Sequence, residues 1–156
     1  MKRALILIFV LFGIFWTYQL TVPNPSYPEQ TSFNTIYPSI TPYPSIDAEK
    51  LLNLINDWKI KQGSQPYTEI KNLCDLTEIR LKEIKTNFSH DGFWKHKDDY
   101  VWKNLSENLS ENYSTEQETF TGWLNSSSHS AILKSDRTYS CLRCEDNKCV
   151  QLFANM

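Results

Sequence analysis

The chain has 156 residues, which is the size of one domain with short additional segments. Its formal net charge is −2 and its lysines are interspersed with acidic residues, so nothing in the charge pattern attracts nucleic acid in general. Aromatic residues make up 13% of the chain, which is enough for a substantial hydrophobic core.

The N-terminal segment, residues 1–21, predicts a signal peptide or a membrane anchor. A strongly apolar run at 4–20 follows two basic residues, and it is slightly short for a spanning helix, which needs about 20 residues. No small residues mark a cleavage site, whereas Trp16 and Tyr18 suit the membrane interface. We therefore favour an anchor that leaves the rest of the chain outside the cytoplasm. Cleavage of the segment, giving a secreted protein, is the alternative.

Residues 22–46 predict an extended linker. This stretch holds six of the seven prolines, and Ser, Thr, Tyr and Asn lie between them without a repeating pattern. Such a segment acts as a spacer between the membrane and the following domain. Recognition of its prolines by a partner is the alternative interpretation.

Residues 47–156 predict one α+β domain that begins with two helices. Asp47 is a plausible N-cap for a helix that continues to Lys61, and a second helix is expected over 72–86. Helical spacing places nine side chains on the inward faces: Leu51, Leu54, Ile55 and Trp58, then Leu73, Leu76, Ile79, Leu81 and Ile84.

The second half of the domain mixes strands with short helices. An aromatic and polar connection at 87–104 is expected to have no regular structure. The elements predicted after it are a strand at 105–113, a helix from an N-cap at Ser114 to Asn125, a short helix from the serines 126–128 to Leu133, and a hairpin of 138–144 with 148–154. This order favours helices packed on a small antiparallel sheet.

Four cysteines lie in the part of the chain that we expect to be exported: Cys74, Cys141, Cys144 and Cys149. An even number outside the cytoplasm predicts disulfides, with three possible pairings. Cys144 and Cys149 flank the predicted hairpin turn, and pairing them leaves Cys74 to meet Cys141, a crosslink that stabilises by roughly 4 kcal/mol. A redox or zinc site at 141–144 is the weaker alternative.

His90, Glu107 and His129 are the candidate site residues. Histidine is a common transition-metal ligand and general base, and two histidines with one carboxylate form a plausible zinc site with an open position. The three residues are 17 and 22 positions apart, which matches no local ligand motif. Their spacing alone therefore does not show that they converge.

Three short segments in fixed order resemble the CAP superfamily, also called SCP/TAPS, which includes cysteine-rich secretory proteins, antigen 5 and pathogenesis-related-1 proteins. The segments are Phe88-Ser89-His90, Glu107-Asn108-Leu109 and Trp123-Leu124-Asn125-Ser126-Ser127-Ser128-His129, and the last is typical of the short bacterial branch. The resemblance covers 47–156 and implies an α-β-α sandwich. It also implies a cleft lined by two histidines and two glutamates, in which the histidine pair can hold a divalent metal.

One acidic residue of that family pattern is missing. The position three residues after the tryptophan is Ser126, so the second glutamate is absent unless Glu111, Glu116 or Glu118 replaces it. His96 matches no family motif and is expected to be solvated.

The resemblance implies a binding module for a lipid, a cell-wall fragment or a protein, with His90, Glu107 and His129 lining the cleft. No catalytic residue is assigned on this interpretation. The alternative is a peptidase-like hydrolase, in which His90 and His129 hold zinc or another divalent metal and Glu107 orients or deprotonates its water. A purely structural domain with a vestigial cleft is a third possibility.

Overall fold

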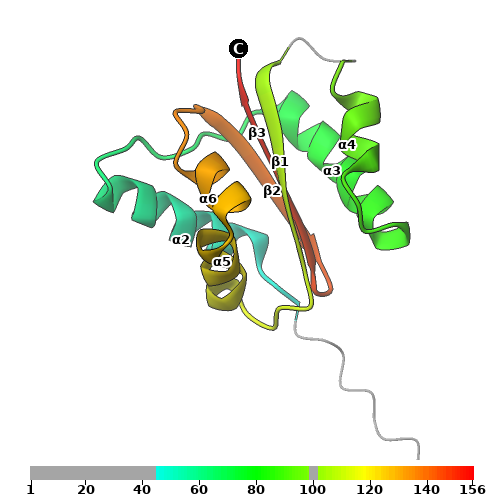
Figure 1. Ribbon diagram of the computed structural model, residues 1–156, viewed down its shortest axis with the longest axis horizontal. Helices are drawn as coiled ribbons and strands as arrows, with labels where there is room; N and C mark the ends of the chain where they lie inside the picture. Colours follow the sequence, from blue (N-terminus) through cyan, green and yellow to red (C-terminus); the bar gives the residue numbers. More distant parts are fainter. Residues whose placement is uncertain (1–44, 99–101) are drawn as a thin grey trace, which may run out of the picture. The chain divides into compact units, whose positions relative to one another are not determined.

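The computed structural model describes residues 45–98 and 102–156. Its elements follow the order α2, α3, α4, β1, α5, α6, β2 and β3 (Figure 1). The predicted anchor at 1–21 and all but the last two residues of the predicted linker lie outside the described residues. Within the described part of the chain, no helix combines the length and apolar character that crossing a bilayer requires.

The first two helices form where the sequence predicts them. Helix α2 spans Ala48–Lys61, and the Asp47 side chain accepts hydrogen bonds from the first backbone N–H groups, which confirms the predicted N-cap. Helix α3 spans Lys71–Thr86. Ile79 was expected to face inward but is 40% exposed, because the adjacent Arg80 is buried on that helix instead.

The short helices show where the sequence prediction was wrong. Helix α4, Asp91–His96, lies inside the connection that was expected to have no regular structure, and six residues are too few to show a helical period. Helix α5, Glu116–Asn125, begins after Thr115 rather than Ser114, because the Thr115 hydroxyl accepts the hydrogen bond from the backbone N–H of Glu118. Helix α6 spans Ser127–Leu133 and begins at the predicted serines.

The strands form one antiparallel sheet in the order β1-β3-β2. Strand β1 spans Lys103–Glu111, and the predicted hairpin is formed by β2, Tyr139–Glu145, and β3, Lys148–Asn155. The expected strand at 105–113 ends earlier because Asn112 adopts a positive φ of 67°. Strand β3 is central, so β1 is an edge strand.

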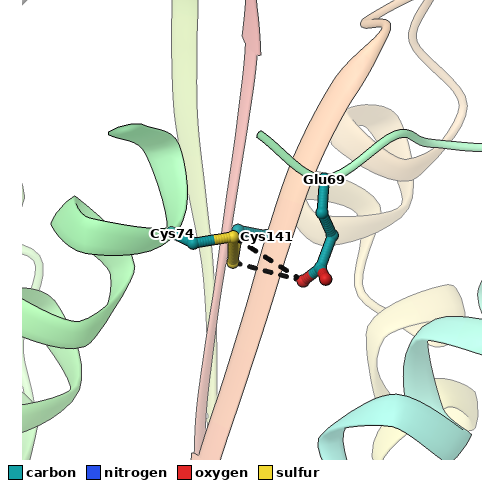
Figure 2. Close-up of side chains that lie close together, drawn as sticks. All are labelled: Glu69, Cys74 and Cys141. Carbon is teal, nitrogen blue, oxygen red and sulfur yellow. Dashed lines mark hydrogen bonds between the residues drawn. A yellow bond between two sulfur atoms is a disulfide. The ribbon is translucent and has the colours of Figure 1, made fainter. Parts of the chain in front are cut away.

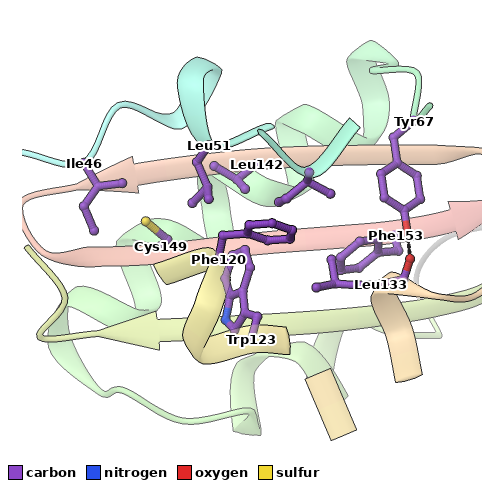
Figure 3. Close-up of a cluster of buried hydrophobic side chains, with 10 residues drawn as sticks. Ile46, Leu51, Tyr67, Phe120, Trp123, Leu133, Leu142, Cys149 and Phe153 are labelled. Atoms are coloured by element: carbon purple, nitrogen blue, oxygen red, sulfur yellow. Dashed lines mark hydrogen bonds between the residues drawn. The ribbon is translucent and has the colours of Figure 1, made fainter. Parts of the chain in front are cut away.

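Helices cover both faces of this sheet, which confirms the α-β-α sandwich (Figure 1). Helices α2, α5 and α6 lie on one face, where the core includes Trp123, Leu133 and Phe153 (Figure 3). Helices α3 and α4 lie on the other face, where the core includes Phe93 and Leu152. Successive residues of β3 alternate between these two cores, as expected for a strand that is buried on both sides.

Two disulfides join the predicted cysteine pairs. Cys74–Cys141 links α3 to β2, and Cys144–Cys149 bridges opposite positions of the β2–β3 hairpin. Because Cys141 and Cys144 belong to different bridges, neither offers a free thiol to a redox or zinc motif at 141–144. Ile46, the last residue of the predicted linker, is buried in the core beside α2 (Figure 3).

Candidate functional site

A cleft at the β1 edge of the sheet brings the three predicted site residues together. It has a volume of about 270 Å³ and is formed by α4, β1 and α6. Its lining combines polar and apolar side chains: His90, Phe93, Trp94, Leu105, Ser106, Glu107, Ser128, His129 and Ile132. Segments that are far apart in the sequence thus meet here because two helix layers flank one edge strand.

Adjacent residues of β1 each hold one histidine of this cleft. Glu107 lies opposite Leu152, on the face covered by α3 and α4, and its Oε1 is 2.8 Å from Nδ1 of His90. Asn108 contacts the opposite layer, where its side-chain Nδ2 donates to the backbone carbonyl of His129 at 3.3 Å. The alternation of side chains along a strand therefore explains why Glu and Asn are needed side by side.

The Glu107 contact orients the His90 imidazole. His90 is the residue before the first turn of α4, and its side chain is 48% exposed, whereas that of Glu107 is 1% exposed. An ionised carboxylate only accepts hydrogen bonds, so Nδ1 carries the hydrogen and donates it. In the neutral imidazole this leaves the lone pair on the other ring nitrogen, Nε2, available to a ligand.

Arg80 neutralises Glu107, and nothing in the sequence motifs pointed to it. Its Nε donates to Glu107 Oε2 at 2.7 Å, and its Nη2 donates to Glu107 Oε1 at 3.1 Å. Nη2 also donates to the backbone carbonyl of Ser89, one residue before His90, at 2.9 Å. Burial alone would lower the pKa of Arg80, but its hydrogen bonds to Glu107 and Glu83 raise that pKa, so the guanidinium stays charged.

The same guanidinium carries a second carboxylate–histidine pair. Arg80 Nη1 pairs with Glu83 Oε2, and the other Glu83 oxygen lies 2.9 Å from His96 Nε2. Burial raises the pKa of Glu83, but the contacts with His96 and Arg80 outweigh it and lower that pKa. The expectation of a solvated His96 was wrong, since its side chain is 25% exposed and bonded to Glu83. Only the i,i+3 spacing of Arg80 and Glu83 on a helix signalled part of this network.

Gly92 allows α4 to lie directly over this network. A Cβ atom at Gly92 would overlap the guanidinium of Arg80 and the carboxylate of Glu83. Glycine is otherwise unfavourable inside a helix, so its presence here is explained by the close approach. It follows that the packing of α4, which begins beside His90, depends on a residue without a side chain.

His129 is held by the opposite layer. It lies in α6, and its side chain is partly buried. Burial lowers the pKa of His129, and the nearby His90 lowers it further, so the neutral imidazole is favoured. In the preceding helix, Trp123 is 1% exposed and its indole N–H donates to the Leu109 carbonyl at 2.9 Å, which fastens this layer to β1.

None of the three alternative acids replaces the missing glutamate. Glu111 pairs with Lys148 at 2.8 Å, Glu116 accepts from the backbone N–H of Asp47 at 2.9 Å, and Glu118 accepts from the backbone N–H of Ser114 at 2.9 Å. None of them lines the cleft. The second acidic position of the family pattern is therefore left unfilled, as the Ser126 substitution predicts, and Glu107 is the one carboxylate among the described lining residues.

Of the described residues in this cleft, only the two imidazoles would be free to hold a divalent metal. Both oxygens of Glu107 are hydrogen-bonded to Arg80 or His90, so Glu107 would not contact the metal itself. It would instead orient His90, as carboxylates orient metal-binding histidines in other sites. The neutral state favoured at His129 suits metal binding. A catalytic zinc normally has three protein ligands, so these two imidazoles would leave the remaining coordination to water or to a bound ligand.

One other group of potential ligands can be set aside. Among the described residues, Glu69, Cys74 and Cys141 are the set whose ligand atoms all lie within 4.8 Å of one another (Figure 2). The two sulfurs form a disulfide, so neither offers a thiolate, and Glu69 Oε1 contacts them at 3.7 and 3.3 Å. The same oxygen accepts a hydrogen bond from Arg143 at 3.0 Å. This cluster is a structural ion pair beside a disulfide.

Comparison with known proteins identifies the fold. No protein-family model matches the sequence, and no curated protein matches it. The structure is similar to that of an extracellular protein containing an SCP domain from Bacillus anthracis, with a TM-score of 0.62 and 21% identity over 70% of this chain and 40% of that one. A cysteine-rich secretory protein from Staphylococcus aureus has a TM-score of 0.62 and 14% identity over 70% and 38% of the two chains. An outer surface protein from Borrelia burgdorferi has a TM-score of 0.60 and 21% identity, and the match covers 69% of this chain and 90% of that one.

The fold is that of an SCP domain, so the family resemblance in the sequence is confirmed at the level of the fold. All three neighbours are bacterial, and the domain has the bacterial-type SCP fold. At these identities the likeness establishes architecture and not activity. The match covers less than half the length of the first two neighbours.

Proposed function

We propose that the chain is an extracytoplasmic SCP-domain protein that binds a small ligand in the cleft between α4, β1 and α6. The observation that carries this proposal is the state of Glu107. Its side chain is 1% exposed, and both of its oxygens are hydrogen-bonded to Arg80 or His90. A buried carboxylate that already takes part in three hydrogen bonds is suited to shaping a binding site rather than to reacting with a substrate or a water molecule.

The remaining groups of the cleft suit recognition. His90 and His129 supply nitrogen donors and acceptors, and the serine hydroxyls of the lining add others, while aromatic and aliphatic side chains form an apolar wall. This combination of an apolar surface with a few convergent polar groups is typical of small-molecule sites.

Export of the domain is supported by independent features. Two disulfides staple the small domain, and such bonds persist outside the reducing cytoplasm. Two of the neighbours are described as an extracellular protein and an outer surface protein. The apolar segment at 1–21 would anchor the chain in the cell membrane, or would release it if cleaved, and 22–46 would separate the domain from the bilayer.

A metal-dependent hydrolase is the second candidate. Imidazoles bind zinc in the neutral form, which is favoured at His129. A carboxylate hydrogen-bonded to the ring, as Glu107 is to His90, is also typical of zinc-binding histidines. Such a metal would supply Lewis-acid chemistry when bound. The chain's own contribution is less suited to hydrolysis, because Glu107 would have to leave Arg80 before it could take a proton.

Histidine variants in the oxidised full-length chain separate these candidates. We expect calorimetric titration to show weak zinc binding that is lost in His90→Ala and in His129→Ala. His96→Ala, which changes the histidine outside the cleft, is the matched control and should keep it. Zinc-dependent peptide cleavage that disappears in Glu107→Gln would instead favour the hydrolase.

Ligand binding is then tested directly by NMR. Soluble cell-wall fragments, lipid micelles and peptides are added in turn to the isotopically labelled protein. The proposal expects at least one class to shift resonances of cleft residues, and this effect should be lost in His129→Ala. If every class leaves the cleft resonances unchanged, the binding proposal is wrong and the structural interpretation stands.

A further inference from the structure

Trp94 presents an exposed indole at the wall of the cleft. The residue is 61% exposed, although a tryptophan side chain would normally bury most of its large apolar surface. The ring of the buried Phe93 contacts it edge to face, with 5.2 Å between the two centroids. The ammonium group of Lys97 lies 5.1 Å from the indole centroid. A large apolar ring is thus held in place at the solvent boundary of the site.

The cleft beside Trp94 is polar, and the one carboxylate among its described lining residues, Glu107, is paired with Arg80. The Lys97 ammonium lies over the indole ring, outside this lining. Ser106 and Ser128 also line the cleft. The Ser106 hydroxyl accepts a hydrogen bond from Arg137, and the Ser128 hydroxyl lies 3.2 Å from that of Ser126. One wall is therefore apolar and aromatic, whereas the rest offers hydroxyls and imidazole nitrogens.

We propose that the cleft binds one ring of a neutral oligosaccharide, with the sugar stacked on Trp94. This inference rests on the proposed function and specifies the class of ligand. A pyranose ring has an apolar face of C–H groups, which matches an indole, and a rim of hydroxyls, which matches the histidines and serines. Neutral hydroxyls also need no charged partner, and the one carboxylate of the described lining is already paired with Arg80.

The size and polarity of the cleft disfavour a lipid. A volume of about 270 Å³ lies below the usual range for sites that enclose a drug-sized ligand, so an acyl chain or a sterol would remain largely exposed to water. Such a chain would also bury the half-exposed His90 against hydrocarbon without new hydrogen bonds, which is costly. A positively charged peptide terminus would find no unpaired carboxylate among the described lining residues, because Glu107 is paired with Arg80.

The test is an NMR and fluorescence titration of the full chain with two uncharged probes, N-acetylated chitotetraose and cellotetraose. We expect at least one probe to shift the indole N–H resonance of Trp94 together with resonances of His90 or His129. Trp94→Ala should weaken that binding by at least about tenfold, and Trp94→Phe should weaken it less. Ile60→Ala, which removes another exposed apolar side chain at 56% exposure, is the control and should have no effect.

The proposal is overturned if neither sugar perturbs Trp94, or if Trp94→Ala binds as well as the unchanged chain. It is also overturned if phospholipid micelles or peptides shift the same resonances while the sugars do not. The last result would leave the binding function intact and change only its ligand class. Loss of every cleft response, with zinc binding at His90 and His129 also absent, would mark failure of the proposed function itself.

Discussion

The two histidines of the cleft come from opposite layers of the sandwich and are held by different forces. His90 depends on a buried chain of charges through Glu107 and Arg80. His129 depends on the packing of α6 and on a hydrogen bond from Asn108 to its backbone carbonyl. The first arrangement orients a side chain, and the second positions a backbone. Perturbing either layer should therefore damage the cleft, but in a distinguishable way.

Removal of Arg80 should have the largest effect. Arg80→Met leaves Glu107 buried without its positive partner, and loss of one member of a buried pair typically costs about 3–5 kcal/mol. We expect a loss of this size in the free energy of unfolding, measured with urea. The double variant Arg80→Met/Glu107→Met removes both charges and is the control. It should recover most of the lost stability, and a cost that remains would attribute the effect to packing.

The two disulfides offer the next comparison, because they close loops of very different length. Cys74–Cys141 joins residues 67 positions apart, whereas Cys144–Cys149 joins residues 5 positions apart. Chain-entropy arguments give about 4 kcal/mol for the long loop and about 2 kcal/mol for the short one. Paired Cys→Ala replacements, compared by urea unfolding, should show that order. Equal losses would mean that strain or residual structure in the unfolded chain outweighs loop entropy.

Much of this layered fold could be predicted from the sequence because its main elements carry local signals. Asp47 caps α2, a helical period marks α2 and α3, and a turn flanked by cysteines marks the hairpin. Ile79 and Arg80 could not be predicted, because the burial of the arginine depends on Glu107, which is 27 residues away. Helix α4 has only six residues, which are too few to show a helical period in the sequence.

The candidate site was predictable only in part, and through family resemblance rather than spacing. That resemblance identified His90, Glu107 and His129, which the structure places on one cleft. It could not identify Arg80, Glu83, Gly92 or His96, since these residues form a network through space. Residues that support a site without lining it belong to no sequence motif here.

Gly92→Ala should selectively disturb the layer of α3 and α4, which holds the ion pairs of Arg80. Alanine normally stabilises a helix relative to glycine by about 1 kcal/mol, but here its methyl group overlaps Arg80 and Glu83. We expect a net loss of about 1–2 kcal/mol and a change in the imidazole nitrogen resonances of His90, measured by NMR. Gly122→Ala is the matched control, because its methyl group would meet Tyr113 instead. If both variants change His90 alike, the layers are not independent.

The smallest expected effect is a pH dependence of folding stability that comes from His129 in α6. Burial and the proximity of His90 lower the pKa of His129 below its ordinary value of 6.5. The unfolded chain therefore binds a proton at His129 more readily than the folded chain does. Stability from this residue is complete above about pH 6.5 and is lost as the pH falls through the lowered value.

Substitution of the histidine isolates that contribution from other titrating groups. Urea unfolding of the unchanged chain and of His129→Gln, each at about pH 7.5 and about pH 5.5, gives two differences to compare. We expect the unchanged chain to lose more stability on acidification than His129→Gln does, and the gap to be small because His129 is only partly buried. A larger loss in His129→Gln would mean that protonation stabilises this side of the cleft. In that case His129 would have to face an acidic group, in addition to His90.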